Sequence, residues 1–173
     1  RIGKDATFTL SSPITSIATT IPVNESTIDM SSVTGYTIEN SVTLQIDNEL
    51  IIYTGLNKTP PYSFTGCQRG AYGTEPAYHS QDAKVYHFTE LFGLFAPDPN
   101  STLFGEIAQN IADVYNQGGF DMVYLDALDG ASIFGGSANA WYYYAKFTWD
   151  VWRRLDHAAL MEMSTFAPHL WVV

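Results

Sequence analysis

The sequence predicts a mixed α/β protein in which a small all-β module, residues 1–84, is followed by an α/β region, residues 85–173. The first half is rich in Thr, Ser, Ile and Val and is interrupted by glycine and proline, which is typical of short β-strands joined by turns. In the second half, apolar residues at helical spacing alternate with short apolar runs, which indicates parallel strands joined by crossover helices. The two patterns predict two domains.

The clearest element of the first half is a β-hairpin. Residues 42–46 and 49–54 are β-rich runs, and Asp47-Asn48 between them is a turn dipeptide. Residues 62–67 predict a further strand, and the glycine-rich stretch that follows predicts a tight loop. Cys67 is the single cysteine of the chain, so no intramolecular disulfide can form, and its β context favours a small buried hydrophobe over a nucleophile.

The second half predicts a strand–helix–strand–helix–strand order. Its expected elements are strands at 85–88, 122–126 and 158–163 and helices at 101–117 and 138–155. Apolar side chains of both parities in the middle strand suit burial on both faces, as in a parallel sheet covered by helices. This order predicts βαβαβ units with right-handed crossovers.

Two carboxylates follow the middle strand. Asp126 ends the strand and Asp129 comes shortly after it. Because ligands bind at the carboxyl ends of parallel strands, these side chains lie where a catalytic acid, base, nucleophile or metal ligand is expected. The alternative is that Asp126 caps the next loop and that Asp129-Gly130 is only a turn.

Glu162 interrupts the last strand near its carboxyl end. A buried carboxylate is costly unless it is paired or used, so this position favours a function. One crossover separates Glu162 from Asp126, which predicts that both lie on the same rim of the sheet. Glycosidic bond cleavage needs two such carboxylates, one to protonate the leaving oxygen and one to act as nucleophile or base. We therefore expect Asp126 and Glu162 to be catalytic, with Asp129 as a supporting acid.

Four other residues are candidates for substrate binding. His87 and Glu90 bracket the carboxyl end of the first predicted strand, and His169 follows the last one, so all three would line the same rim. Trp141 opens an aromatic cluster that suits stacking on a sugar ring, whereas its helical spacing favours core packing. No His-x-x-x-His pair or Gly-rich phosphate loop is present, so we expect no metal and no cofactor.

Short motifs follow one another through the first half in a recognisable order. They are Ile46-Asp47-Asn48-Glu49-Leu50-Ile51-Ile52-Tyr53-Thr54-Gly55, Phe64-Thr65-Gly66-Cys67-Gln68-Arg69-Gly70, Tyr72-Gly73-Thr74 and the stretch 79–85. In this order the first half resembles a small β module found in phage structural proteins and in bacterial surface or secreted proteins. The resemblance implies an attachment or carbohydrate-binding role and an extracellular or cell-surface location.

The middle strand of the second half ends in Tyr124-Leu125-Asp126. With this motif the region 85–173 resembles the middle of a (β/α)8 glycoside hydrolase of the α-galactosidase-like and α-glucosidase-like group. The resemblance implies that Asp126 is the nucleophile, while the acid/base of that group lies on a later strand that has no counterpart here. A complete barrel needs roughly 250 residues, so we expect an incomplete TIM-type barrel. The rest of a larger chain or another subunit would complete it, and this part alone would be inactive; a three-layer α/β domain completed in another way is the structural alternative.

Charge and composition limit the partners. A net charge of −10 with 8 Lys and Arg residues argues against a nucleic-acid surface, and no apolar run reaches the length of about 18 residues that a membrane span needs. An aromatic content of 14% with few bases suits neutral sugar rings. The expected function is hydrolysis of glycosidic bonds in a poly- or oligosaccharide substrate. The alternative is a non-catalytic surface or fibre protein that attaches through its β module or binds carbohydrate with it.

Overall fold

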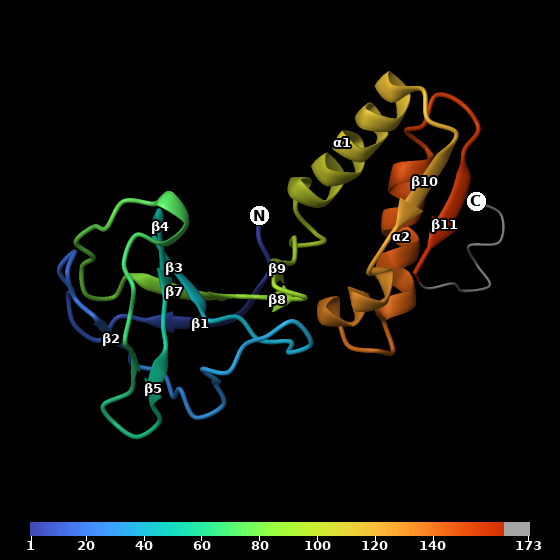
Figure 1. Ribbon diagram of the computed structural model, residues 1–173. Coiled ribbons are helices and arrows are strands. Elements are labelled where there is room, and N and C mark those ends of the chain that lie inside the picture. The colour runs from blue at the N-terminus through green and yellow to red at the C-terminus, as the bar shows by residue number, and fades with distance from the viewer. Residues whose placement is uncertain (165–173) are drawn as a thin grey trace. The chain divides into compact units, whose positions relative to one another are not determined.

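A computed structural model describes residues 1–164 of the chain. Its contacts define two compact units: Gly3–Ala96, here called the β module, and the region from Pro97 onward together with Arg1–Ile2, here called the α/β unit (Figure 1). Antiparallel sheets form the β module, whereas helices and a parallel strand pair form the α/β unit. The mixed α/β class predicted from the sequence is confirmed.

The β module contains two antiparallel sheets and a short hairpin. The first sheet has the order β1 (Lys4–Thr9), β7 (Lys84–Phe88), β3 (Thr43–Ile46) and β4 (Glu49–Ile52). The second has the order β2 (Thr20–Pro22), β6 (Ser63–Thr65) and β5 (Gly55–Asn57), and the hairpin joins β8 (Glu90–Leu91) to β9 (Leu94–Phe95). A short 3-10 helix, η1 (Ala71–Gly73), follows Gly70. The predicted hairpin is confirmed, because β3 pairs antiparallel with β4 across a turn in which Asp47 has φ 51°.

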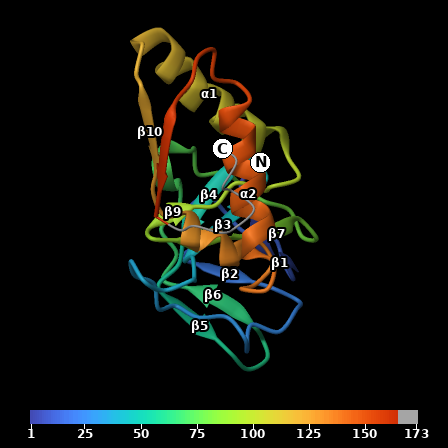
Figure 2. The ribbon, with the colours of Figure 1, turned by 90° about the vertical axis from the view of Figure 1, so that its right-hand side faces the viewer.

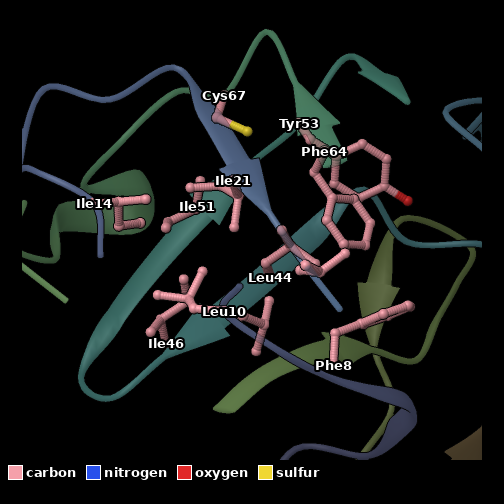
Figure 3. Packing of buried hydrophobic residues seen from close by; sticks show 12 residues of the cluster. Phe8, Leu10, Ile14, Ile21, Leu44, Ile46, Ile51, Tyr53, Phe64 and Cys67 are labelled. Carbon is pink, nitrogen blue, oxygen red and sulfur yellow. The ribbon is translucent and has the colours of Figure 1, made fainter. Parts of the chain in front are cut away.

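The core of the β module draws side chains from both sheets. Leu44 of β3, Ile21 of β2 and Phe64 of β6 are fully buried and point into one interior (Figure 3). The ring of Phe64 meets Phe8 edge-on with 5.1 Å between centroids, and its centroid lies 4.8 Å from that of Tyr53. Alternate residues along each short strand therefore supply one shared core, as the period of a β-strand requires.

Strand β7 is an antiparallel strand of the β module. Val85 lies opposite Phe8 of β1 and Ile46 of β3, so β7 sits between these two strands. The expectation that residues 85–88 form the first parallel strand of the second half is therefore wrong. A short apolar run suits a central antiparallel strand as well as a parallel one, and strand pairing decides between the two.

The α/β unit runs through two helices and two strands. Its elements are α1 (Thr102–Gly118), β10 (Met122–Leu125), the 3-10 helix η2 (Leu128–Phe134), α2 (Ala140–Trp152) and β11 (Leu160–Met163). β10 and β11 pair in parallel, with Met122 opposite Leu160, as predicted for strands joined by a crossover helix. Figure 2 shows the two strands side by side with both helices to one side of them.

The parallel pair is buried on one face only. Val123 and Leu125 are 7% and 6% exposed, whereas Met122, Tyr124 and Leu160 are 46%, 56% and 72% exposed. The expectation of a strand buried on both faces is therefore wrong for β10. The helices cover the face of Val123 and Leu125. Because the other face also carries apolar residues, the sequence does not show that only one face is buried.

Helix α1 buries part of the apolar face that its sequence spacing predicts. Its buried residues are Phe104, Ala108, Ala112 and Tyr115. The helical spacing of Ile107 and Ile111 predicts that both lie in the core, but they are half-buried. Leu160 is predicted in the core as part of the apolar run 158–163, but it is exposed. The buried part of α1 is therefore narrower than its apolar face; the helix contacts α2, and Tyr115 packs with Val123 and Leu125.

Candidate functional site

The carboxyl ends of β10 and β11 hold the three predicted catalytic carboxylates. Tyr124 lies opposite Glu162 in the parallel register, so both side chains are on the exposed face of the pair. Asp126 directly follows β10, and Asp129 lies in the first turn of η2. All three carboxylates are exposed. The argument for Glu162 from its burial is therefore wrong, while its place near the carboxyl end of β11 is as predicted.

The carboxylate of Asp126 is held through one of its oxygens. The backbone N–H of Ala127 donates to Oδ1 over 2.8 Å, and the hydroxyl of Tyr124 donates to the same oxygen over 3.2 Å. Ala127 has φ 57° and ψ 22°, a left-handed conformation that costs a non-glycine residue about 1–2 kcal/mol. Such strain persists where the surrounding structure determines the backbone, and it is frequent at functional sites.

Ser164 connects the end of β11 to Asp129. Its hydroxyl donates to Asp129 Oδ1 over 3.2 Å and accepts the N–H of Leu128 over 2.9 Å. Its own N–H donates to the carbonyl of Leu125 over 3.1 Å and so continues the ladder between the strands. These bonds hold the start of η2 against β11 and so fix where Asp129 lies.

The three carboxylates act together on the phenol of Tyr124. Its pKa is raised above the ordinary value of 10.0, first by the hydrogen bond to Asp126 and then by desolvation and by the charges of Asp126, Glu162 and Asp129. The phenol is therefore protonated at neutral pH and can act as a donor.

Sequence reasoning missed Tyr124 and Ser164. Each stands two residues from a predicted carboxylate, Tyr124 before Asp126 and Ser164 after Glu162. Because side chains two residues apart lie on the same side of a strand, this spacing was the available signal. Within residues 1–164, no three His, Cys, Asp or Glu side chains gather closely enough to hold a metal ion. The groups brought together are suited to acid–base and nucleophilic chemistry by carboxylates.

His87 lies in the core of the β module and is not at a solvent-facing rim. Its Nδ1 is 2.6 Å from Asp5 Oδ1, and its Nε2 is 3.0 Å from the hydroxyl of Tyr53 and 2.9 Å from the carbonyl of Ser41. The imidazole is fully buried and cannot contact a substrate. The expected rim position is wrong because β7 belongs to the antiparallel sheet. Glu90 also belongs to the β module, where it is half-buried in β8, and so it does not lie on the parallel pair either.

The remaining two candidates lie at α2 and beyond the described part of the chain. Trp141 is in the first turn of α2 and is 51% exposed, with its ring edge-on to Tyr142 at 6.0 Å. Core packing, which its helical spacing favoured, therefore does not account for Trp141. His169 lies outside the described residues.

A second cluster of charged groups lies buried in the β module. Glu49 is 1% exposed and accepts hydrogen bonds from Arg69 through Nε and Nη2, both over 2.7 Å, and from His79 Nε2 over 2.8 Å. The N–H groups of Gly70 and Ala77 also donate to it, each over 3.0 Å. Burial raises the pKa of Glu49, but these donors outweigh it and lower the pKa to about 2. The donors to the Glu49 carboxylate all come from residues 69–79, so the network holds the loop at residues 68–79, here called the anchored loop.

Comparison of the chain with protein-family models, with curated proteins and with solved structures found no match. No helix among residues 1–164 has the length and apolar character needed to cross a membrane. The geometry at the carboxyl ends of β10 and β11 is therefore what supports a function.

Proposed function

We propose that the chain is part of a carbohydrate-active enzyme that hydrolyses glycosidic bonds in a poly- or oligosaccharide. One observation carries the proposal: Asp126, Glu162 and Asp129 come from neighbouring elements at the carboxyl end of a parallel pair, where Asp126 accepts a hydrogen bond from Tyr124 and Glu162 lies opposite Tyr124. Strands joined in this way build (β/α)8 barrels, in which active sites lie at this end of the strands. The motif Tyr124-Leu125-Asp126, which resembles that of the α-galactosidase-like and α-glucosidase-like group, supports the same reaction.

The proposed chemistry divides two roles between carboxyl groups. One carboxyl group, in its acid form, protonates the glycosidic oxygen while the bond from this oxygen to the anomeric carbon breaks. In one route an ionised carboxylate attacks the anomeric carbon, and water then displaces this carboxylate. In the other route the carboxylate takes a proton from a water molecule that attacks the anomeric carbon directly. In both routes water supplies the new hydroxyl of the sugar and returns the proton. Asp126 is the nucleophile or base, Glu162 is a second participating carboxylate, and Asp129 supports them through its bond with Ser164.

The exposed face of the parallel pair supports a neutral sugar as substrate. The ring of Tyr124 is 56% exposed on this face, near the carboxyl end of β10. Apolar and aromatic side chains suit the apolar faces of sugar rings, whereas a net charge of −10 disfavours acidic polysaccharides. An extracellular or cell-surface location, where such polymers occur, belongs to the same proposal.

We propose further that β10 and β11 are part of an incomplete TIM-type barrel. Within the described residues these two strands pair only with each other, and one face of the pair is open. Parallel sheets in other proteins are covered on both faces. The rest of a larger chain or another subunit would add the missing strands and the acid/base that the resembled group carries on a later strand.

The test is hydrolysis by the full-length protein. A panel of neutral oligo- and polysaccharides of α- and β-linkage would be incubated with wild type, with the double variant Asp126→Asn/Glu162→Gln and with Asp113→Asn. Asp113 is the control because it lies on α1 and accepts a hydrogen bond from Gln109. We expect new reducing ends with wild type and with the control but not with the double variant. Absence of hydrolysis across the panel, or hydrolysis by the double variant, would contradict the proposal.

A binding role of the β module is the second candidate, and one observation favours it. Tyr72 and Tyr78 are 63% and 64% exposed on the anchored loop, and Tyr72 has φ 56°. Exposed aromatic side chains on a rigidly held loop suit recognition of a sugar or of another surface. Retention of the protein on immobilised polysaccharide should be lost in Tyr72→Ala, and equal retention of wild type and variant would argue against this role.

A further inference from the structure

Tyr124 is placed by β10 where its hydroxyl reaches Asp126. The two residues lie two positions apart at the end of the strand and so project to the same side. The ring is 56% exposed and fills no core. The hydroxyl of an exposed tyrosine normally forms hydrogen bonds with water. The hydroxyl of Tyr124 instead donates to Asp126 Oδ1 over 3.2 Å.

The two carboxylate oxygens of Asp126 differ in their hydrogen bonds. Oδ1 accepts from Tyr124 and from the N–H of Ala127, and within residues 1–164 no hydrogen bond reaches Oδ2. Two donors on one oxygen fix the rotation of a carboxylate and leave the other oxygen directed away from them. The left-handed backbone of Ala127 contributes one donor, and Tyr124 contributes the other.

We propose that Tyr124 is a positioning residue that holds Asp126 by Oδ1 so that Oδ2 faces the substrate. This rests on the proposed function, in which Asp126 is the reacting carboxylate. The phenol keeps its proton throughout. Its cross-strand neighbour Glu162 acts on it through charge, which together with Asp126 keeps the hydroxyl a donor.

Removing the hydroxyl should impair turnover more than binding. A misplacement of about 1 Å can lower a rate by roughly 100-fold, so Tyr124→Phe in the full-length protein should lower kcat by roughly 10- to 100-fold while KM changes by less than about threefold. A merely structural role would not give this split between kcat and KM.

The control and the second measurement separate the outcomes. Tyr36→Phe removes the hydroxyl of another exposed tyrosine, one in the β module, and should leave kcat unchanged. In protein with 13C-labelled tyrosine, the titration of the Tyr124 ring should move to lower pH in Asp126→Asn but not in Asp113→Asn. This NMR measurement needs no substrate.

A wild-type protein that cleaves no glycoside would overturn the proposed function, whatever the result of the Tyr124 titration. An active wild type with unchanged kcat in Tyr124→Phe would overturn the positioning role alone. A Tyr124 titration that does not respond to Asp126→Asn would also overturn it, because the bond from the hydroxyl to Asp126 would then be absent.

Discussion

Glu49 shows how a buried charge can organise a loop. Its carboxylate binds Arg69 through two nitrogens, and His79 lies between Glu49 and Asp47, with each ring nitrogen 2.8 Å from a carboxylate oxygen. Removing one member of such a group leaves the others buried without a partner, which typically costs about 3–5 kcal/mol. The anchored loop therefore depends on the charge of a residue that the sequence shows only as the first position of a strand.

The stability of the β module should fall in acid because of Glu49. Its pKa is lowered from 4.5 to about 2, so its stabilisation is complete above the unfolded value and is lost as the pH falls through about 2. The shift corresponds to roughly 3 kcal/mol. Hydrogen exchange of the backbone amides of β3 at pH 5 and pH 2 would measure it. Glu49→Gln should show weaker protection at pH 5 and a smaller change between the two pH values, whereas equal protection of wild type at both would contradict the assignment.

Cys67 should be unreactive until the β module opens. The side chain is 5% exposed, and burial raises the pKa of the thiol to about 12 although Arg69 opposes the shift. Since the thiolate is the reactive form, a disulfide reagent such as DTNB at pH 8 should label the native protein at least roughly 100-fold more slowly than the unfolded protein. All four tryptophans lie after residue 140, so labelling of Cys67 reports on the β module and tryptophan fluorescence on the α/β unit. Labelling at the rate of a free thiol without denaturant would contradict this prediction, because it would show that the Cys67 thiol is accessible in the folded protein.

At the scale of elements, periodicity predicted which helices and strands exist but not how every strand pairs. The hairpin of β3 and β4, the helices and the parallel pair are found where the pattern indicated. Strand β7 was assigned to the wrong sheet because a run such as Val85 to Phe88 carries no information about its partner. In β10, Met122 and Tyr124 look as apolar as Val123 and Leu125, so burial on one face could not be distinguished from burial on two.

The one-sided sheet predicts unequal effects for two leucines. Leu125→Ala, at 6% exposure, should lower the free energy of unfolding of the α/β unit by roughly 2–5 kcal/mol, because it opens a cavity under the helices. In the 173-residue chain, Leu160→Ala, at 72% exposure, should change it by less than about 0.5 kcal/mol. Urea unfolding followed by tryptophan fluorescence would measure both. Similar losses in the two variants would mean that the exposed face is covered after all.

At the scale of the whole molecule, the topology rule for parallel strands correctly brought Asp126, Asp129 and Glu162 to one end of the pair. The same rule placed His87 incorrectly because it was applied to a strand of the other unit. Tyr124 and the backbone of Ala127 were not predicted, because hydrogen bonds at a strand end depend on side-chain and backbone angles that periodicity does not report.

The most direct test of the proposed hydrolase is the single substitution Asp126→Asn in the full-length protein. Asparagine keeps the shape of the side chain but cannot act as a carboxylate nucleophile or base. On a glycoside that wild type cleaves, we expect kcat to fall by roughly 1,000-fold or more with an unchanged circular dichroism spectrum, while Asp113→Asn keeps wild-type turnover. Turnover near the wild-type value in Asp126→Asn would contradict the account.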